Sequence, residues 1–211
     1  MTGLPEGIER RAFDGRERLS TCGQPVYGEP TDGEWRCWDA GRSKLGAMLE
    51  TGMDVDLSGG ESVLYLGAAS GTTVSHVADF AGPTYAVEFA PRPVRDLIDV
   101  AEDRPNLFPL LKDARKPETY AHIVETDLDL LVQDVATRGQ AAVAVDNAQF
   151  LADEGQLCLA VKARSEDVTA DPETVFEQVR EEIAAAAYEI VDTRRLEPYH
   201  GDHLGIVARK R

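Results

Sequence analysis

The residues with the clearest chemical potential lie in a glycine-bearing segment that follows a short apolar run. Residues 66–73 read Leu-Gly-Ala-Ala-Ser-Gly-Thr-Thr and continue directly from the run Ser62–Leu66. Gly67 and Gly71 permit positive φ angles and a close approach of the backbone to a ligand. A strand, a glycine-bearing turn and a helix N-terminus in this order predict the cofactor position of a doubly wound α/β fold.

Carboxylates are expected at the ends of the next three strands. Glu88 lies about 20 residues after Gly67, where a carboxylate can accept both ribose hydroxyls of an adenosine. Asp113 could accept the exocyclic amine of adenine, and Asp134 lies where the reactive group is expected. This acidic set suits an adenosine with a cationic, phosphate-free tail, and so predicts S-adenosylmethionine as cofactor. Any one of these acids could instead cap a helix or lie solvated in a loop.

Other cofactor motifs are incomplete in this chain. Ala69 interrupts a G-x-G-x-x-G pattern, and no Gly-Lys-Ser/Thr triplet follows the loop. A nicotinamide dehydrogenase and a P-loop nucleotidase are therefore disfavoured. Cys22, Cys37 and Cys158 are isolated, without a C-x-x-C pair, so we expect neither a metal site nor a disulfide framework.

Apolar strands alternate with amphipathic helices from Ser62 onward, which predicts a doubly wound, mostly parallel sheet. The last two strands follow one another without a helix, so one of them is expected to be antiparallel. The expected strands are 62–66, 84–89, 107–111, 128–135, 156–163, 189–196 and 204–209. The expected helices are 72–81, 93–103, a short irregular one at 117–124, 140–151 and 172–187.

Residues 1–56 have a different character, with frequent glycines, aromatic side chains and the turn signals Asp14-Gly15 and Asp32-Gly33. This pattern predicts a small antiparallel sheet. A helix from Ser43 to about Glu50, with Ser43 as N-cap, is expected to connect it to the rest. We therefore divide the chain into a β-rich subdomain, 1–56, and a methyltransferase domain, 57–211.

The charge of the chain argues at first against nucleic acid. Its net charge is −16, from 38 acidic and 22 basic residues, whereas phosphate contacts normally come from a basic face. The acids are dispersed, however, and the cations comprise 17 Arg but only 5 Lys. This composition is typical of a halophile, in which molar salt shortens the Debye length to about 3 Å and screens repulsion from RNA. An acidic mesophilic protein is the alternative.

No segment indicates export or membrane insertion. The first residues, Met1–Glu6, lack the basic-then-apolar layout of a signal peptide. No apolar run approaches the ~20 residues of a membrane-spanning helix. We expect a cytoplasmic protein that does not bind a membrane.

Several segments, in order along nearly the whole chain, resemble the fibrillarin family, specifically its archaeal form. That family consists of S-adenosylmethionine-dependent 2′-O-methyltransferases, which box C/D guide RNAs direct to rRNA and tRNA. The resemblance implies the Rossmann-like sheet of class I methyltransferases, with about seven strands. The segments are Arg42–Leu45, Val63–Thr73, Tyr85–Phe89, Arg95–Leu97, Asp113–Arg115, Asp134–Ala136, Val161–Ala163 and Leu196–Tyr199.

The resemblance also implies the residues of the site. The catalytic set would be Lys44, Asp134, Lys162 and His203. Thr137 stands where the family usually has Gln, so a shorter side chain occupies this position. The cofactor-binding set would be Gly67, Ala68, Ser70, Gly71, Thr72, Thr73, Glu88, Phe89, Asp113, Ala114, Asp134, Val135, Ala136 and Thr137.

Methyl transfer to a ribose 2′-hydroxyl requires removal of the hydroxyl proton, and an amine can serve as the base. Lys162 is the candidate base, Asp134 could orient it, and His203 could bind the ribose or relay the proton. Lys44 could orient a substrate phosphate or share in deprotonation, so the sequence leaves open which lysine is the base. Retention of Lys at 44 and 162 in an Arg-rich chain independently favours a role for the amine.

The implied partners are a box C/D guide RNA with its target rRNA or tRNA, a coiled-coil scaffold protein and a kink-turn-binding ribosomal-type protein. Two other functions stay open at this point. One is a methyltransferase of the same fold that modifies a small molecule or a protein without a guide. The other is a catalytically silent assembly subunit that retains the cofactor pocket.

Overall fold

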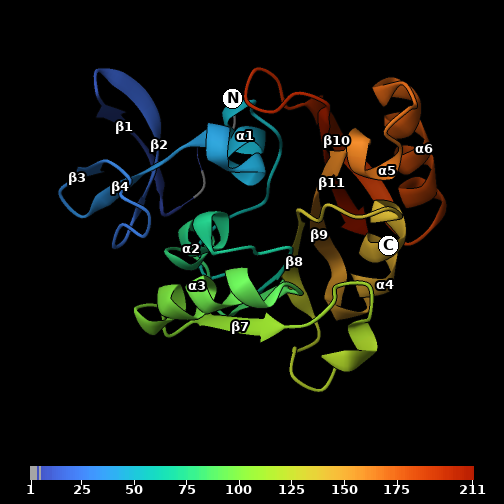
Figure 1. Cartoon of the computed structure of the whole chain (residues 1–211), viewed down its shortest axis with the longest axis horizontal. Helices are drawn as coiled ribbons and strands as arrows, with labels where there is room; N and C mark the ends of the chain where they lie inside the picture. Colours follow the sequence, from blue (N-terminus) through green and yellow to red (C-terminus); the bar gives the residue numbers. More distant parts are fainter. Residues whose placement is uncertain (1–3, 5) are drawn as a thin grey trace.

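The central strands of the larger sheet are apolar on both faces, as expected for strands that helices cover on either side. β5 (Val63–Leu66) is buried along its whole length. The computed structural model describes residue 4 and residues 6–211, and its larger sheet has the order β10-β11-β9-β8-β5-β6-β7 (Figure 1). The other strands are β6 Thr84–Glu88, β7 Leu107–Leu111, β8 Leu128–Gln133, β9 Leu151–Lys162, β10 Tyr188–Arg195 and β11 His203–Lys210.

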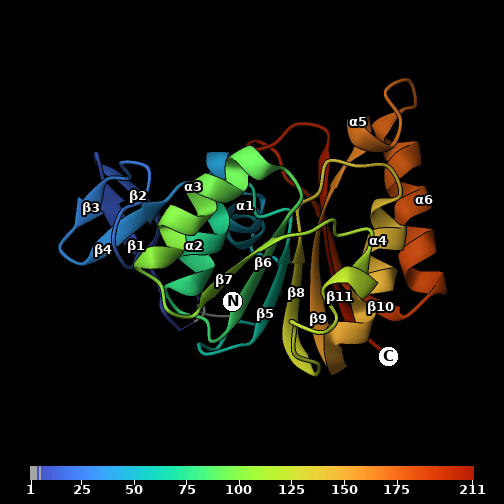
Figure 2. The same ribbon diagram turned by 60° about the horizontal axis from the view of Figure 1, so that its bottom comes forward.

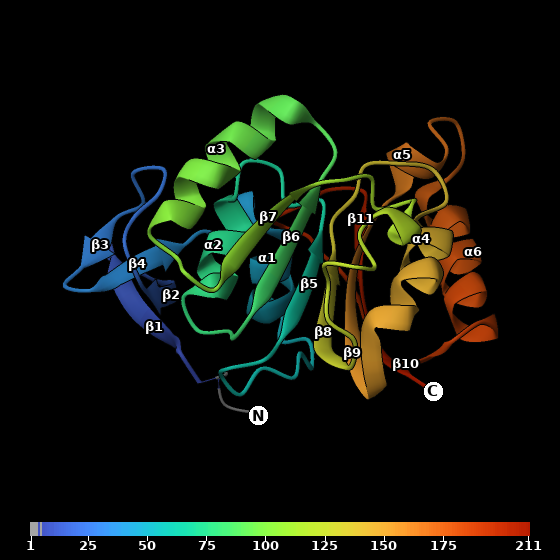
Figure 3. The same cartoon turned by 90° about the horizontal axis from the view of Figure 1, so that it is seen from below.

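The strand directions confirm the doubly wound prediction. β5, β6, β7, β8 and β9 are parallel to one another, whereas β11 is antiparallel to both β9 and β10. The chain crosses from β5 to β6 on one side and later returns to place β8 on the other, as the view from below shows (Figure 3). A ligand crevice is expected at this switch point, outside the carboxyl ends of β5 and β8.

Helices cover the sheet on both faces (Figure 2). Val63 and Tyr65 share a buried cluster with side chains of α1, α2 and α3, whereas Leu64 and Leu66 share one with α4 and α6. Alternate residues of one strand therefore serve opposite layers. The helices are α1 Lys44–Glu50, α2 Thr72–Ala78, α3 Pro91–Glu102, α4 Gln140–Asn147, α5 Ala163–Glu166 and α6 Pro172–Ala185, with short 3-10 helices at Ala40–Arg42, Pro117–Thr119 and Ala148–Phe150.

The predicted small antiparallel sheet is present, with the order β1-β2-β4-β3 (Figure 1, blue). Its strands are β1 Ile8–Phe13, β2 Arg16–Cys22, β3 Thr31–Asp32 and β4 Trp35–Trp38. Leu19 and Trp38 of this sheet lie in the same buried cluster as Val74 of α2 and Met48 of α1. Apolar packing therefore continues across the division at residue 56, which stays a prediction. Residues 1–3 and 5, including part of the segment searched for a signal peptide, lie outside the described residues.

Two boundaries in the second half of the sheet differ from the sequence prediction. The expected helix 140–151 ends at Asn147, and β9 begins at Leu151 rather than at residue 156. Leu128 of β8 pairs with Leu151, but Leu130 pairs with Gln156, so the polar residues between them form an irregular excursion. The sequence prediction placed the start of the strand after these residues because they interrupt its apolar pattern. The single-turn helix α5 was not predicted either.

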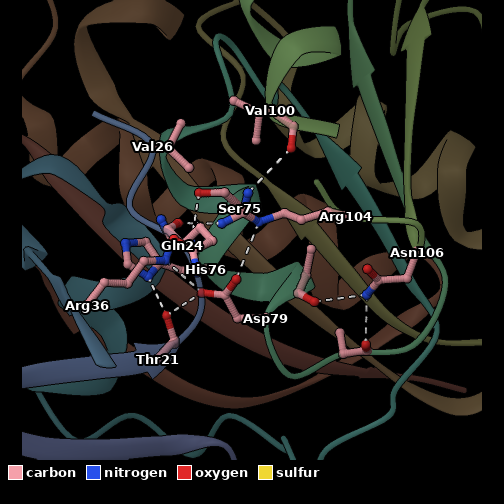
Figure 4. Close-up of polar contacts among 12 residues, drawn as sticks. Thr21, Gln24, Val26, Arg36, Ser75, His76, Asp79, Val100, Arg104 and Asn106 are labelled. Atoms are coloured by element: carbon pink, nitrogen blue, oxygen red, sulfur yellow. Dashed lines mark hydrogen bonds and ion pairs between the residues drawn. The ribbon is translucent and has the colours of Figure 1, made fainter. Parts of the chain in front are cut away.

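A buried ionic cluster joins the small sheet to α2 and α3 (Figure 4). The Arg36 side chain on β4 is fully buried, and its Nε donates to Asp79 Oδ2 at 2.8 Å. Arg104 Nε lies 3.3 Å from the other Asp79 oxygen, and Arg104 Nη2 donates to the Gln24 carbonyl at 2.8 Å. One buried carboxylate thus contacts two guanidinium groups from different parts of the chain, and Glu29 Oε1, 3.5 Å from Arg36 Nη1, supplies a second buried negative charge.

His76 completes this cluster as a neutral ring. Burial, followed by the charges of Arg36 and Arg104, lowers its pKa well below the usual value. Thr21 donates its single hydroxyl proton to Asp79 at 2.6 Å, so His76 Nδ1 must donate to the Thr21 oxygen at 2.7 Å. The neutral ring stacks on Trp38, with ring centres 5.0 Å apart.

Removal of the shared carboxylate should destabilise the protein strongly. Asp79→Ala removes the ion-pair partner of buried Arg104 and leaves buried Arg36 with Glu29 alone, 3.5 Å away, and we expect a loss of about 3–5 kcal/mol of unfolding free energy. Asp153, whose side chain is 94% exposed and 3.9 Å from Lys210, provides the control. Asp153→Ala should cost less than about 0.5 kcal/mol. Urea unfolding at constant salt measures both, and equal losses would contradict the proposed importance of the cluster.

Candidate active site

The glycine loop passes so close to the end of β8 that only glycine fits at its first position. Gly67 has φ +83°, and a Cβ there would lie 2.2 Å from the Asp134 carbonyl oxygen. The Asp134 N–H donates to the Leu66 carbonyl at 2.9 Å, which extends the pairing of β5 and β8 to this point. The loop and the start of the Asp134 segment are therefore held as one wall.

Glu88 fixes the other side of the loop. Its side chain is buried at the end of β6, where one carboxylate oxygen accepts the Ala69 N–H at 3.1 Å and the other accepts the Ala90 N–H at 2.8 Å. The Tyr27 hydroxyl, from the loop between β2 and β3, also donates to the Ser70 carbonyl. Hydrogen bonds from the Glu88 and Tyr27 side chains to the backbone thus hold the loop from two sides.

A cavity of about 290 Å³ opens beside this loop at the switch point of the sheet. Of the residues predicted to bind the cofactor, its wall contains Gly67, Glu88, Phe89, Asp113, Ala114, Asp134, Val135, Ala136 and Thr137. The predicted residues outside its wall are Ala68, Ser70, Gly71, Thr72 and Thr73, which form the turn and the start of α2. The prediction missed Ala69, Val87, Lys112, Arg115 and Val143, of which Lys112 and Arg115 could have been inferred from their closeness to Asp113.

A second cavity, of about 450 Å³, lies at the opposite edge of the sheet. Its wall includes Asp56, Glu61, Asp129 and Glu154, and it contains no part of the glycine loop. We therefore assign the ligand to the cavity at the switch point.

Asp113 is held as a carboxylate by Arg115. The Arg115 Nη2 and Nε atoms lie 2.7 and 2.9 Å from the two Asp113 oxygens, and the Arg115 N–H donates to the same side chain at 3.0 Å. These hydrogen bonds lower the pKa of Asp113 below its usual value. The acceptor expected for an adenine amine is thus ionised and fixed in direction.

Lys44 and Asp134 meet although ninety residues of sequence separate them. Lys44 begins α1, whose N-cap Ser43 accepts the Gly46 N–H at 3.0 Å. Its Nζ lies 3.0 Å from Asp134 Oδ2, and Asp134 is itself part of the cavity wall. A cation from the first helix therefore lies directly beside the predicted cofactor site.

Lys162 and His203 lie opposite each other, as the last residue of β9 and the first residue of β11. His203 Nδ1 is 2.6 Å from the Gly201 carbonyl oxygen. Because a carbonyl only accepts, Nδ1 carries the proton and Nε2 is an acceptor when the ring is neutral. Burial, with the charges of Lys44 and His200, lowers the pKa of His203, while the hydrogen bond to the Gly201 carbonyl and the charge of Asp134 oppose that shift. The four predicted catalytic positions thus belong to one end of the sheet.

His200 is a neighbour of this group that sequence reasoning did not assign. Its ring centre lies 5.6 Å from that of His203, and its Nε2 donates to the Ala40 carbonyl at 2.8 Å. Ala40 begins the short helix that leads to Lys44. His200 therefore ties the loop before β11 to the segment that carries Lys44.

The donor set fits S-adenosylmethionine. Gly67 lies in the cavity wall, where Glu88, Asp113 and Asp134 supply carboxylates that would repel a pyrophosphate. Among the described residues, no group of three His, Cys, Asp or Glu side chains is placed to hold a metal ion. The described part of the chain also has no helix that is long and apolar enough to cross a membrane. The fold and this site define an S-adenosylmethionine-dependent methyltransferase.

Comparison with known proteins identifies the family. The family model described as Fibrillarin matches residues 14–211. The chain is 71% identical over 208 residues to a fibrillarin-like rRNA/tRNA 2'-O-methyltransferase of Haloarcula marismortui, with 99% of this chain and 98% of that relative covered. This chain belongs to the fibrillarin family. That relative comes from a halophilic archaeon, which agrees with the origin predicted from composition.

Solved structures of the family superpose on the whole chain. The fibrillarin of a fibrillarin/Nop5p complex matches with a TM-score of 0.91 at 41% identity, covering 100% of both chains. Aeropyrum pernix fibrillarin in complex with natively bound S-adenosyl-L-methionine matches with a TM-score of 0.86 at 44% identity, covering 97% of this chain and 94% of that one.

Gly67→Ala should weaken cofactor binding because its Cβ would collide with the Asp134 carbonyl. Gly28 has a similar φ of +73° with nothing within 4 Å of an added Cβ, so Gly28→Ala imposes only the backbone strain. We expect the Kd for S-adenosylmethionine to rise at least about 10-fold in Gly67→Ala, which corresponds to 1.4 kcal/mol. It should stay within about 2-fold of wild type in Gly28→Ala. Calorimetric titration in molar salt measures both, and equal Kd values would contradict the steric argument.

His203 should titrate below its usual pKa in the folded protein. The unfolded chain binds this proton near pH 6.5, but the folded protein does not, so the contribution of His203 to stability is full above that pH. It is lost as the pH falls from there towards the lowered value. Because burial is the main cause, the shift should persist in molar salt. NMR titration, assigned with His203→Gln, checks this; a midpoint at or above that of the urea-unfolded chain would refute it.

Proposed function

We propose that this chain transfers a methyl group from S-adenosylmethionine to the ribose 2′-hydroxyl of rRNA and tRNA nucleotides. The observation that carries the proposal is the Lys44–Asp134 pair, 3.0 Å apart, whose carboxylate lies in the wall of the cavity at the switch point. Close relatives are named rRNA/tRNA 2'-O-methyltransferases, which supports this substrate. The chain would act as the catalytic subunit of a box C/D guide RNA particle.

The cofactor would be held by the cavity wall and the turn before α2. Glu88 and Asp113 would accept hydrogen bonds from its adenosine, and the Asp134–Thr137 segment would lie beside its reactive end. When bound, the cofactor supplies a methyl group on a positively charged sulfur. Carboxylates around the cavity would attract that cation. The turn residues Ala68, Ser70, Gly71, Thr72 and Thr73 would complete this site.

Each of the four predicted catalytic side chains would have its own role in positioning the ribose or removing its hydroxyl proton. Asp134 already engages the Lys44 ammonium, so Lys44 would bind a substrate phosphate and orient the ribose. Lys162 forms no ion pair with any residue that the structure describes, so we assign it as the base that removes the 2′-hydroxyl proton. The neutral His203 ring would accept a hydrogen bond at Nε2 from the ribose or relay the proton.

The net charge determines how RNA must reach this site. A chain with a charge of −16 should bind RNA weakly on its own, because most of the affinity for phosphates comes from positive charge. We therefore assign guide binding to partners: a coiled-coil scaffold protein and a kink-turn-binding ribosomal-type protein. The match to a fibrillarin bound to Nop5p supports a protein scaffold. We place the assembled particle in the cytoplasm.

Lys162→Ala should slow methyl transfer by at least about 100-fold, because a general base usually contributes at least that factor to the rate. The assay uses the particle reconstituted in molar salt, with labelled cofactor and a guide-matched RNA. Lys116→Ala, which removes an exposed lysine that is not in the cavity wall, is the matched control and should retain wild-type activity.

Two results would overturn the proposal. Label on a small molecule or protein, rather than on a guide-matched ribose, would indicate a methyltransferase with another substrate. A particle that assembles without binding cofactor would indicate a silent assembly subunit.

A further inference from the structure

The end of β9 extends beyond its neighbour β8. β8 ends at Gln133, which pairs with Leu159, whereas β9 continues to Lys162. On this side the backbone N–H and C=O of Lys162 have no strand to bond. Buried peptide groups need partners, so another part of the chain must supply them.

The side-chain amide of Gln140 occupies the place of the missing strand. Its Oε1 accepts the Lys162 N–H at 2.9 Å, and its Nε2 donates to the Lys162 carbonyl at 3.2 Å. Gln140 is the first residue of α4, which packs beside β9 (Figure 2), and it is completely buried. The side-chain amide of Gln140 thus forms hydrogen bonds with both the backbone N–H and the backbone C=O of Lys162.

The Gln140 amide is itself held in a single orientation. Glu166 Oε1 accepts Gln140 Nε2 at 3.0 Å, which identifies this atom as the nitrogen. The Glu166 carboxylate also accepts the Gly139 N–H at 2.8 Å and the Gln140 N–H at 2.6 Å. Gln133 Nε2 donates to the Gln140 carbonyl at 2.7 Å. These bonds connect the start of α4 to the ends of β8 and β9.

Gln140 also lies three residues after Thr137, the last residue of the cofactor wall formed by Asp134–Thr137. We infer that Gln140 is a positioning residue for methyl transfer: it fixes the backbone of Lys162, and hence the point from which the amine reaches the cavity. This inference rests on the proposed function, in which Lys162 acts on the 2′-hydroxyl.

The same strand contains a matched control. Gln156 is also buried, and its side chain also joins two backbone groups: Oε1 accepts the Asp56 N–H at 2.7 Å and Nε2 donates to the Asp54 carbonyl at 3.1 Å. It lies six residues before Lys162 on β9, in the wall of the other cavity and away from the cofactor cavity. Gln156→Met therefore removes an equivalent pair of bonds without touching Lys162.

The test compares Gln140→Met, Gln156→Met, Lys162→Ala and the double variant Gln140→Met/Lys162→Ala in the reconstituted particle. Single-turnover methylation gives the rate, calorimetry the cofactor Kd, and thermal melting the Tm. We expect Gln140→Met to slow methylation about 10- to 100-fold, as a displaced reacting group does. Its Kd should stay within about 3-fold of wild type, while Gln156→Met lowers Tm similarly and keeps the wild-type rate. The double variant should be no slower than Lys162→Ala, since both changes affect one group.

Equal rates for Gln140→Met and Gln156→Met, or losses that multiply in the double variant, would overturn the inference while leaving the proposed function intact. A normal rate in Lys162→Ala would instead refute the assignment of the base, and the inference with it. Gln140→Asn, which keeps the amide but is one methylene shorter, is used if Gln140→Met does not fold. Slowed methylation with unchanged cofactor Kd is expected there too, and a wild-type rate would overturn the inference.

Discussion

The backbone of Gly67 lies against the carbonyl of Asp134 with no room for a side chain between them. This contact joins the ends of β5 and β8, where a doubly wound sheet opens its ligand crevice. This contact fixes the glycine loop relative to the Asp134 segment, which lines the cavity and supplies the carboxylate that pairs with Lys44. The position of the glycine loop relative to the Lys44–Asp134 pair is therefore set by main-chain packing rather than by flexible side chains.

Local sequence pattern was sufficient for the parts of the molecule that local physics determines. Strand and helix alternation predicted the parallel sheet, and the spacing from Gly67 to Glu88 predicted the acidic end of β6. The meeting of Lys44 with Asp134 could not be obtained in this way, because no periodicity relates residues so far apart. It was reached only through the resemblance of the flanking motifs to a known family. Of the cofactor set, the resemblance also named turn residues such as Thr72 that lie outside the cavity wall.

Residues whose partners are distant in sequence were the hardest to interpret. The sequence analysis assigned no role to Arg36 or Arg104, yet both are buried and share the Asp79 carboxylate. Gln140 looked like the polar start of a helix, although its side chain completes the hydrogen bonding of β9. In each case the polar group is explained by a neighbour that only the tertiary structure supplies.

The ionic cluster around Asp79 has a consequence for how the molecule unfolds. The small sheet contributes Arg36 and Thr21 to it, while α2 and the end of α3 contribute the remaining charges. If the small sheet unfolded alone, buried Asp79 would lose its contacts with Arg36 and Thr21. If the segment that carries Asp79 unfolded alone, buried Arg36 would lose that carboxylate. The two sheets should therefore behave as one cooperative unit, with calorimetric and van't Hoff enthalpies that coincide. Amide hydrogens of β2 and β4 should then exchange through the same global opening as those of the central strands.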